Sequence, residues 1–362
     1  MIAQEPLDQT VATVEKSAAN GGDWAGFSGI EEFPETKLVV MTWARGFTVP
    51  QTVLNYVAGR DALDTMDMRL DTSGAYTYAQ LEAAADQVET MDEDAFGVTI
   101  QADGSGLVVE RTATASSGSR RTAPNPYVVA YENSADAPKA MAYRQNDTAS
   151  GGWSSGARIR IGNLRCSSGF GVTVSGTAYL VTANHCAPGN GARVTDGNGD
   201  SIGYTARKDL THEVIGIEAS SVSGLMYHRE WNNTNGPRER VVGTVSSGKG
   251  SYVCTSGSFT GTNCDLKIIS GSYRYKIEDN IWRRGVRAER QSNNRAVGNG
   301  DSGGPVLKNT STAGNIKAAG IISAGQTRLD SCGGNADNTT CYRKVIYMQM
   351  SNADLGGSVI TN

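Results

Sequence analysis

From about residue 148 onward the sequence consists of short apolar runs separated by Gly, Ser and Asn, among them "GFGVTV", "TAYLVTA", "VIGIEA" and "IKAAGIISAG". Runs of this length, bounded by turn-forming residues, are typical of antiparallel strands and not of a parallel sheet. The only helical pattern in this part is "IYMQMSNADLG", close to its end. Residues 149–362 are therefore expected to form a mainly β domain, a barrel or a sandwich.

The residues before this part have a different pattern. The segment 76–91 has apolar residues at helical spacing, and "FGVTIQADGSGLVVERT" has two alternating runs joined by a turn. These features predict a small α+β domain over residues 1–112. A Ser-, Thr- and Pro-rich stretch follows, so residues 113–148 are expected to be a linker that is open to proteolysis, with Arg120–Arg121 as one cleavage site.

All six cysteines lie after residue 165. Six cysteines allow 15 pairings, and we expect the sequential one, which closes short loops: Cys166–Cys186, Cys254–Cys264 and Cys332–Cys341. An even number of cysteines in one part of a chain favours disulfides and an extracellular compartment; the alternative is buried thiols in a cytosolic protein. No CxxC spacing occurs, so neither zinc nor another metal is expected.

Charge is distributed unevenly along the chain. Residues 1–140 hold 21 Asp and Glu and 9 Lys and Arg, a balance of −12, whereas residues 141–362 hold 16 and 24, a balance of +8. Either the two parts dock through complementary fields, or both are unrelated solvated surfaces. The net charge of −4 indicates no nucleic-acid partner. No apolar run approaches the roughly 18 residues of a membrane span, and the first ten residues lack the apolar core of a signal peptide.

The densest glycine cluster, "VGNGDSGGPV", surrounds Ser302. Glycines allow the tight loop that brings backbone N–H groups close to a ligand, as a nucleophilic serine requires, although the same letters also suit an ordinary turn. Of the three histidines, only His185 follows an apolar run and directly precedes a cysteine, in "YLVTANHC". If His185 is a catalytic base, the end of a strand and an adjacent disulfide would hold it rigidly enough for catalysis. The alternative is a histidine that only packs beside the disulfide.

Together the two motifs resemble those of the chymotrypsin-type serine proteases, and in particular the secreted bacterial branch of the streptogrisins and α-lytic protease. The resemblance covers roughly residues 148–355 and includes "RCSSGFGVTV" and "YVCTSGSFTGTNC". It implies two six-stranded antiparallel β-barrels, a protein or peptide substrate and no cofactor. It also implies that His185 is the general base, that Ser302 is the nucleophile, and that the N–H groups of Gly300 and Ser302 form the oxyanion hole.

The family orients its imidazole with an Asp that precedes an apolar strand. Aligning "KDLTHEVIGIEASS" on its apolar run "VIGI" puts Glu213 at this position. Asp209 lies four residues earlier and is the alternative, and Glu218 lies beyond the strand. Because glutamate is one methylene longer, the strand or the imidazole must shift. This departure leaves open a second hypothesis, a catalytically silent binding protein on the same fold.

The resemblance also implies that Asp301 is buried, that it sets the oxyanion loop, and that it needs a cationic partner. In this branch an Arg supplies the charge, but the matching position is Thr255. The expected partner is a new N-terminus or one of the nearby arginines Arg283, Arg284, Arg287, Arg290 and Arg295.

Substrate preference is expected to follow from two short stretches. The resemblance places Ala296 at the floor of the substrate pocket and Ser323, Ala324 and Gly325 along its wall. Ala296 carries no charge and the wall has no bulky side chain. We therefore expect cleavage after uncharged, apolar or aromatic residues.

In this branch an N-terminal segment of over 100 residues acts as a pro-region that assists folding and inhibits until it is cleaved. The sequence thus predicts a secreted serine endopeptidase made as a zymogen, with 1–112 as the pro-domain that binds the protease domain 149–362. The mature chain is expected to begin near Ala149–Gly152. An esterase would use the same chemistry but usually carries GxSxG on an α/β fold. "TDGNGDS" (195–201) is expected to be a hairpin turn and not a calcium loop.

Overall fold

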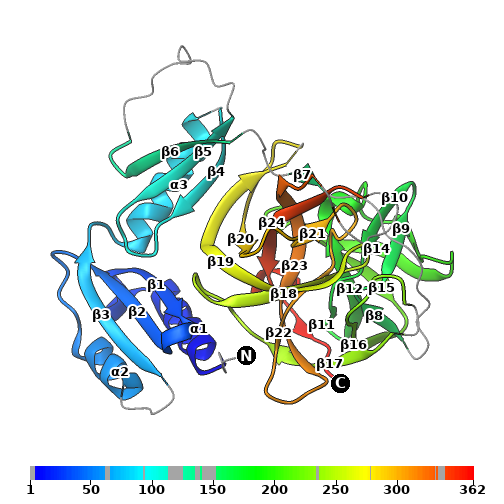
Figure 1. Cartoon of the computed structure of the whole chain (residues 1–362), viewed down its shortest axis with the longest axis horizontal. Helices are drawn as coiled ribbons and strands as arrows, with labels where there is room; N and C mark the ends of the chain where they lie inside the picture. The colour runs from blue at the N-terminus through cyan, green and yellow to red at the C-terminus, as the bar shows by residue number, and fades with distance from the viewer. Residues whose placement is uncertain are drawn as a thin grey trace. The chain divides into compact units, whose positions relative to one another are not determined.

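The computed structural model describes residues 5–61, 66–92, 94–112, 125–134, 139–140, 152–233, 236–277, 279–330, 332 and 339–362 (Figure 1). The chain divides into two compact units. The first comprises Met1–Ala137, Ser246–Ser251 and Ile268–Lys276, and the second comprises Pro138–Val245, Tyr252–Lys267 and Ile277–Asn362. Within the described ranges no helix has the length and apolar character needed to cross a membrane.

A three-stranded sheet and two helices form one part of the first unit. The elements are α1 (Glu5–Ala19), η1 (Gly22–Trp24), β1 (Phe27–Phe33), η2 (Pro34–Thr36), β2 (Leu38–Ala44), α2 (Gln51–Asp61) and β3 (Asp67–Gly74). β2 is the central strand, antiparallel to β1 and parallel to β3. Leu7, Val11 and Val14 recur at helical spacing along α1 and pack in one core with Trp43 of β2 and Val53 of α2. The apolar stripe of α1 is thus buried by this sheet.

The helix expected over 76–91 is α3 (Tyr78–Met91). Thr77 and Gln80 form a capping box, in which each side chain accepts a hydrogen bond from the other residue's N–H. α3 packs against β4 (Ala95–Ile100), which forms the expected hairpin with β5 (Leu107–Thr112). β6 (Val128–Ser134) pairs parallel with β5. This strand lies in the range expected to be a linker, and Arg120–Arg121 lies outside the described residues.

Residues from the C-terminal half of the sequence complete the first unit. β4 pairs antiparallel with Tyr273–Tyr275, near the end of the long strand β19 (Gly261–Lys276). The Arg274 side chain is only 2% exposed. It donates hydrogen bonds of 2.6–2.9 Å to three carboxylates of α3, those of Glu82, Asp86 and Glu89. Within this unit, acidic residues of the N-terminal part therefore contact a basic residue of the C-terminal part.

An eight-stranded antiparallel sheet forms one part of the second unit. In spatial order its strands are β10 (Leu164–Ser167), β9 (Arg158–Ile161), β13 (Arg193–Asp196), β14 (Ser201–Asp209), β15 (Val214–Ala219), β12 (Thr177–Ala183), β11 (Gly171–Val174) and β25 (Ser358–Val359). Alternate side chains point into its core, where Ile159, Ile161, Leu180 and Ile217 form one cluster. This alternation is what the short apolar runs of the sequence encode.

The remaining strands follow a second path. Its order is β21 (Val297–Gly298), β24 (Cys341–Gln349), β20 (Trp282–Arg290), β19, β18 (Tyr252–Gly257), β22 (Pro305–Asn309), β23 (Asn315–Arg328), β17 (Arg238–Thr244), β16 (Val222–Tyr227) and β8 (Trp153–Ser155). Because β23 also pairs with β24, the six strands from β24 to β23 close into a ring. The mainly β class is confirmed. The second sheet contains the expected ring of six, whereas the first has eight strands instead of six.

Local features of the second unit follow the sequence closely. The three disulfides have the expected sequential pairing. The 195–201 segment is a hairpin turn. Oδ1 of Asp196 accepts hydrogen bonds of 2.8–2.9 Å from the backbone N–H groups of residues 198, 199 and 200. The terminal helix α4 (Met350–Ala353) is a single turn, and the first four residues of the segment expected to be helical belong to β24.

Candidate active site

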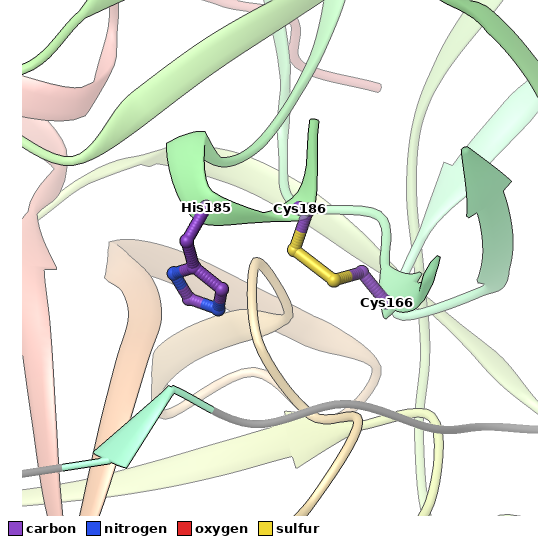
Figure 2. Close-up of side chains that lie close together, drawn as sticks. All are labelled: Cys166, His185 and Cys186. Atoms are coloured by element: carbon purple, nitrogen blue, oxygen red, sulfur yellow. A yellow bond between two sulfur atoms is a disulfide. The ribbon is translucent and has the colours of Figure 1, made fainter. Parts of the chain in front are cut away.

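His185 lies just past β12, in the one-turn 3-10 helix η3 (Asn184–Cys186). The disulfide to Cys166 ties the neighbouring Cys186 to β10 (Figure 2). One ring nitrogen of His185 and the two sulfur atoms lie within 4.8 Å of one another. The sulfur atoms are bonded to each other, and a metal would require a thiolate. The cluster therefore holds the imidazole in place and is not a metal site.

Glu213 directs both of its carboxylate oxygens at His185. Oε1 accepts the main-chain N–H of His185 at 2.8 Å, and Oε2 lies 3.0 Å from the ring nitrogen Nδ1. The Glu213 side chain is fully buried, and its backbone φ of 55° lies in the left-handed region that few residues other than glycine adopt. Its carbonyl oxygen accepts the N–H of Asn184 at 2.9 Å. Side chain and backbone together thus fix the glutamate against the turn that carries the imidazole.

Asp209, the alternative orienting acid, binds a different histidine. Its Oδ2 lies 2.7 Å from Nδ1 of His212, and its Oδ1 accepts the His212 N–H at 3.1 Å. Partial burial acts to raise the pKa of Asp209, but the hydrogen bonds from His212 outweigh it, so the pKa lies below its ordinary value. Glu218 lies farther along β15 and is exposed. Of the three acids considered, the structure brings Glu213 to His185.

Ser302 lies in a tight loop shaped by glycines with positive φ. The φ angles are 101° at Gly300 and 82° at Gly303, values that glycine adopts without a steric cost. A Cβ at position 303 would lie 2.0 Å from Oγ1 of Thr182, so no side chain fits there. The Ser167 hydroxyl donates to the carbonyl oxygen of Gly300, and the Ser167 N–H donates to that of Ser302, both at 2.8 Å.

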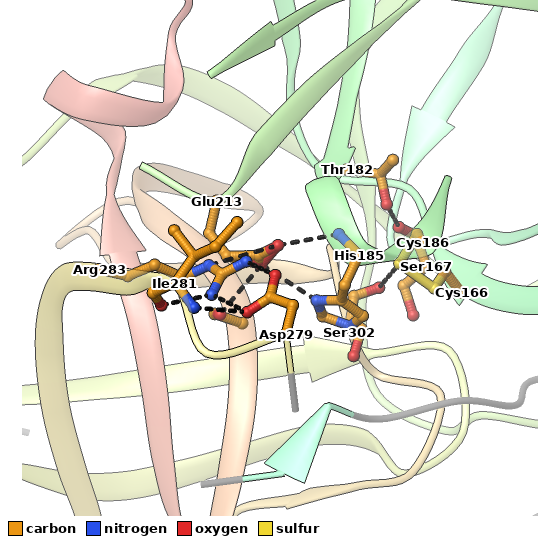
Figure 3. Close-up of polar contacts among 11 residues, drawn as sticks. Cys166, Ser167, Thr182, His185, Cys186, Glu213, Asp279, Ile281, Arg283 and Ser302 are labelled. Atoms are coloured by element: carbon orange, nitrogen blue, oxygen red, sulfur yellow. Dashed lines mark hydrogen bonds and ion pairs between the residues drawn. A yellow bond between two sulfur atoms is a disulfide. The ribbon is translucent and has the colours of Figure 1, made fainter. Parts of the chain in front are cut away.

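The imidazole and the serine loop meet at one disulfide. Ser167, which binds the loop, directly follows Cys166, and Cys186 directly follows His185. Sγ of Cys186 lies 3.9 Å from the carbonyl oxygen of Ser302. Figure 3 draws the Ser302 and His185 side chains in the same group of residues as this disulfide. The second ring nitrogen of His185, Nε2, is buried and has no hydrogen-bond partner among the described residues.

Four neutral donors bind the Asp301 carboxylate. Oδ1 accepts the N–H of Phe259 at 2.9 Å and that of Thr260 at 3.2 Å. Oδ2 accepts the Thr260 hydroxyl at 2.5 Å and the N–H of Gly298 at 2.8 Å. Gly257 makes room for this anchor, since a Cβ there would lie 2.1 Å from Cγ of Asp301. Sequence reasoning missed Thr260, although its place inside the second disulfide loop was a usable signal.

The arginines expected near Asp301 lie in different places, and Arg295 is the one beside it. Arg295 lies beside this anchor and donates to the carbonyl oxygen of Thr260 at 3.2 Å. Burial lowers the pKa of Arg295 below its ordinary value, although the Asp301 charge acts to raise it. Arg283 instead lies beside Glu213, and Arg287 lies 3.4 Å from Oε1 of Gln326. The other two arginines, Arg284 and Arg290, also belong to β20.

The residues expected at the substrate pocket lie on β23 and just before β21. Ala296 is fully buried, and its carbonyl oxygen accepts the hydroxyl of Thr255, the residue found where the family's Arg was expected, at 2.6 Å. The Ser323 hydroxyl donates to Oε2 of Glu213 at 3.3 Å, so Ser323 belongs to the acid's environment. The backbone of Ala324 and Gly325 pairs antiparallel with β7 (Lys139–Ala140). This stretch of β23 is therefore an edge that accepts an extended chain.

Comparison with known proteins gives the following. No family model matches the sequence. Similar solved structures include Protease A of Thermobifida fusca, with 24% identity, 58% of this chain and 98% of that chain covered, and a TM-score of 0.44. A serine protease specific for glutamic acid is 22% identical, with 57% of this chain and 100% of that chain covered and a TM-score of 0.43. A Nocardiopsis protease has 24% identity, with 57% and 98% covered and a TM-score of 0.42.

Proposed function

We propose that this chain is a secreted serine endopeptidase, made as a zymogen, that acts through Ser302, His185 and Glu213. The observation that carries the proposal is the two-point contact of Glu213 with His185, next to a serine loop that is fastened to the same disulfide. Acyl transfer requires a nucleophile, a base and an orienting group, and Ser302, His185 and Glu213 would supply them.

In the proposed reaction Glu213 keeps the proton on Nδ1, which leaves Nε2 of His185 as the base. Nε2 takes the proton of the Ser302 hydroxyl while Oγ attacks the carbonyl carbon of the substrate. The resulting oxyanion lies toward the N–H groups of Gly300 and Ser302. The imidazolium then gives its proton to the leaving amine, and an acyl-enzyme remains on Ser302. Water, activated by the same imidazole, hydrolyses this ester and restores the serine.

The substrate is proposed to bind as an added strand. Ala324 and Gly325 already pair in an antiparallel register with Lys139 and Ala140, which supports this mode of binding. An extended peptide in the same antiparallel register would run toward Ser323. The buried, uncharged Ala296 supports a preference for apolar or aromatic residues before the scissile bond.

We further propose that residues 1–112 act as a pro-domain. Arg274 donates hydrogen bonds to three carboxylates of α3, and it belongs to a strand of the protease half of the sequence. These contacts support a role for residues 1–112 in folding the protease half. β7 lies between the pro-domain and the protease in sequence and pairs with the substrate edge, which supports self-inhibition before cleavage. The candidate cleavage sites at Arg120–Arg121 and Ala149–Gly151 lie outside the described residues.

A serine-directed fluorophosphonate tests the central proposal. Full-length protein is incubated until it is processed, its N-terminus is sequenced, and the labelled residue is identified by mass spectrometry. The proposal expects one label per processed chain, on Ser302, and loss of the label in Ser302→Ala and His185→Ala. A processed, folded chain that takes up no label would favour the catalytically silent binding protein instead.

A further inference from the structure

An ion pair between the buried Arg283 and the exposed Asp279 lies beside the proposed orienting acid (Figure 3). Arg283, on β20, has a fully buried side chain, and its Nε lies 3.8 Å from Oε1 of Glu213. The far side of the same guanidinium donates two hydrogen bonds to the carboxylate of Asp279, one of them at 2.7 Å. Nη1 also donates to the carbonyl oxygen of Ile281 at 2.8 Å. The guanidinium is thus fixed by Asp279 on one side and faces Glu213 on the other.

The charges of this group complement the charge change at the imidazole. A cation beside Glu213 would by itself cancel the negative charge that stabilises an imidazolium. Asp279 supplies a second negative charge, so Glu213, Arg283 and Asp279 together carry −1. When His185 gains a proton the four side chains together become neutral. The pair therefore holds Glu213 without removing its electrostatic effect.

Glu213 has a particular need for such support. Its side chain has one more rotatable bond than aspartate and therefore more conformational freedom to lose. Its backbone φ of 55° is maintained only where the surroundings impose it. Of its carboxylate oxygens, Oε1 faces Arg283 and the His185 N–H, and Oε2 faces Nδ1 of His185 and the Ser323 hydroxyl.

We propose that Arg283 and Asp279 form a positioning pair that fixes Glu213 in the orientation that aligns the imidazole of His185. The inference rests on the proposed function, because it assigns these residues a role in the same proton transfer. Neither residue contacts the reacting atoms; both act through Glu213. The sequence could not assign this role, since Arg283 lies 70 positions after Glu213 and meets it only in the folded chain.

The test measures kcat, KM and the pH dependence of kcat/KM for single and double variants. Arg283→Gln should lower kcat by about 10²-fold with little change in KM, as expected from a misplaced catalytic group. It leaves excess negative charge beside His185, so the acidic limb of the profile should move to higher pH. Asp279→Asn leaves excess positive charge, so the limb should move to lower pH. The double variant should return the limb toward the wild-type position while kcat stays low.

Two further variants make the outcome specific. Arg283→Lys keeps the charge and should recover part of kcat, whereas Arg284→Gln, on the exposed neighbour in the same strand, should behave as wild type. If Arg283→Gln does not fold, the inference is tested by the other two variants. Asp279→Asn is read by the position of the acidic limb of the pH profile, and Arg283→Lys is read by its kcat. Limbs that stay fixed in Asp279→Asn, or full activity in Arg283→Gln, would overturn the inference. An inactive, unlabelled wild-type protein would instead refute the proposed function.

Discussion

Glu213 binds His185 twice, through the backbone N–H to Oε1 at 2.8 Å and through the ring nitrogen Nδ1 to Oε2 at 3.0 Å. The first contact fixes where the carboxylate lies, and in the proposed reaction the second keeps the proton on Nδ1. A glutamate can therefore take the place expected for aspartate because a turn of the backbone, and not the imidazole alone, defines its position.

Replacing Glu213 with Gln should lower kcat by about 10³–10⁴-fold with little change in KM. The amide still fills the space, but it no longer stabilises an imidazolium and can donate where the carboxylate accepted. Steady-state kinetics on a peptide substrate measure the effect. Asp209→Asn is the matched control, because Asp209 binds His212, and its kcat should stay near wild type. The reverse ranking of the two variants would assign the orienting role to Asp209.

Gly257→Ala should disturb the oxyanion loop from outside the motif. The new Cβ would lie 2.1 Å from Cγ of Asp301, so the loop or β18 must move. Overpacking of this kind costs roughly 1–3 kcal/mol of stability, and kcat should fall as well. Denaturant unfolding and kinetics are compared with Gly59→Ala in α2, where the added Cβ meets no atom within 4 Å. Wild-type activity in Gly257→Ala would mean that Asp301 does not set the loop.

Substrate preference should be read from a peptide library cleaved by the processed protein. The wild type should cleave after apolar or aromatic residues, since Ala296 offers no charge. Ala296→Asp should move the preference toward Lys and Arg, because the carboxylate would face the substrate side chain. A wild-type preference for Lys or Arg would exclude this pocket. A preference for Glu would direct attention to Arg287, whose guanidinium lies next to Gln326 on β23.

The first unit should become less stable as the pH rises from 5 to 8. Burial raises the pKa of Glu15 from its ordinary value of 4.5 to about 7. Because the folded state holds the proton more tightly, its contribution is complete below the unfolded pKa and is lost as pH rises through about 7. The loss should be on the order of 2 kcal/mol, reduced by the partial exposure of the side chain. Thermal unfolding of Glu15→Gln should lose this dependence, and Glu5→Gln, on an exposed residue, should keep it.

The role of the pro-domain is tested by refolding. Residues 141–362 refolded alone should recover little activity, because a β-rich chain with distant strand pairings folds slowly. Residues 1–140 added as a separate chain should restore it, and Arg274→Gln should weaken that effect because three carboxylates of α3 lose their partner. Arg284→Gln serves as the control. Full recovery without residues 1–140 would reject the folding role.

Local sequence patterns, together with the family resemblance that supplied Glu213, indicated the residues of the candidate site that strand ends position. His185 follows an apolar strand and Glu213 precedes one, so strand ends fix both, and the cysteine pairs close loops of short sequence separation. The roles of Thr260 and Arg283 depend on which strands lie side by side, and no local pattern reports that. The strand β6 was missed for a similar reason, since its pairing with β5 and not its own composition makes it a strand.

Three backbone amides and the Thr260 hydroxyl donate hydrogen bonds to Asp301, and none of these four groups gains or loses a hydrogen across the working range of an enzyme. These four contacts, which hold the loop that carries Ser302, are therefore not expected to change with pH. A pH dependence of the proposed reaction is therefore expected to report chiefly on His185 and on the charged groups beside it, Glu213, Arg283 and Asp279.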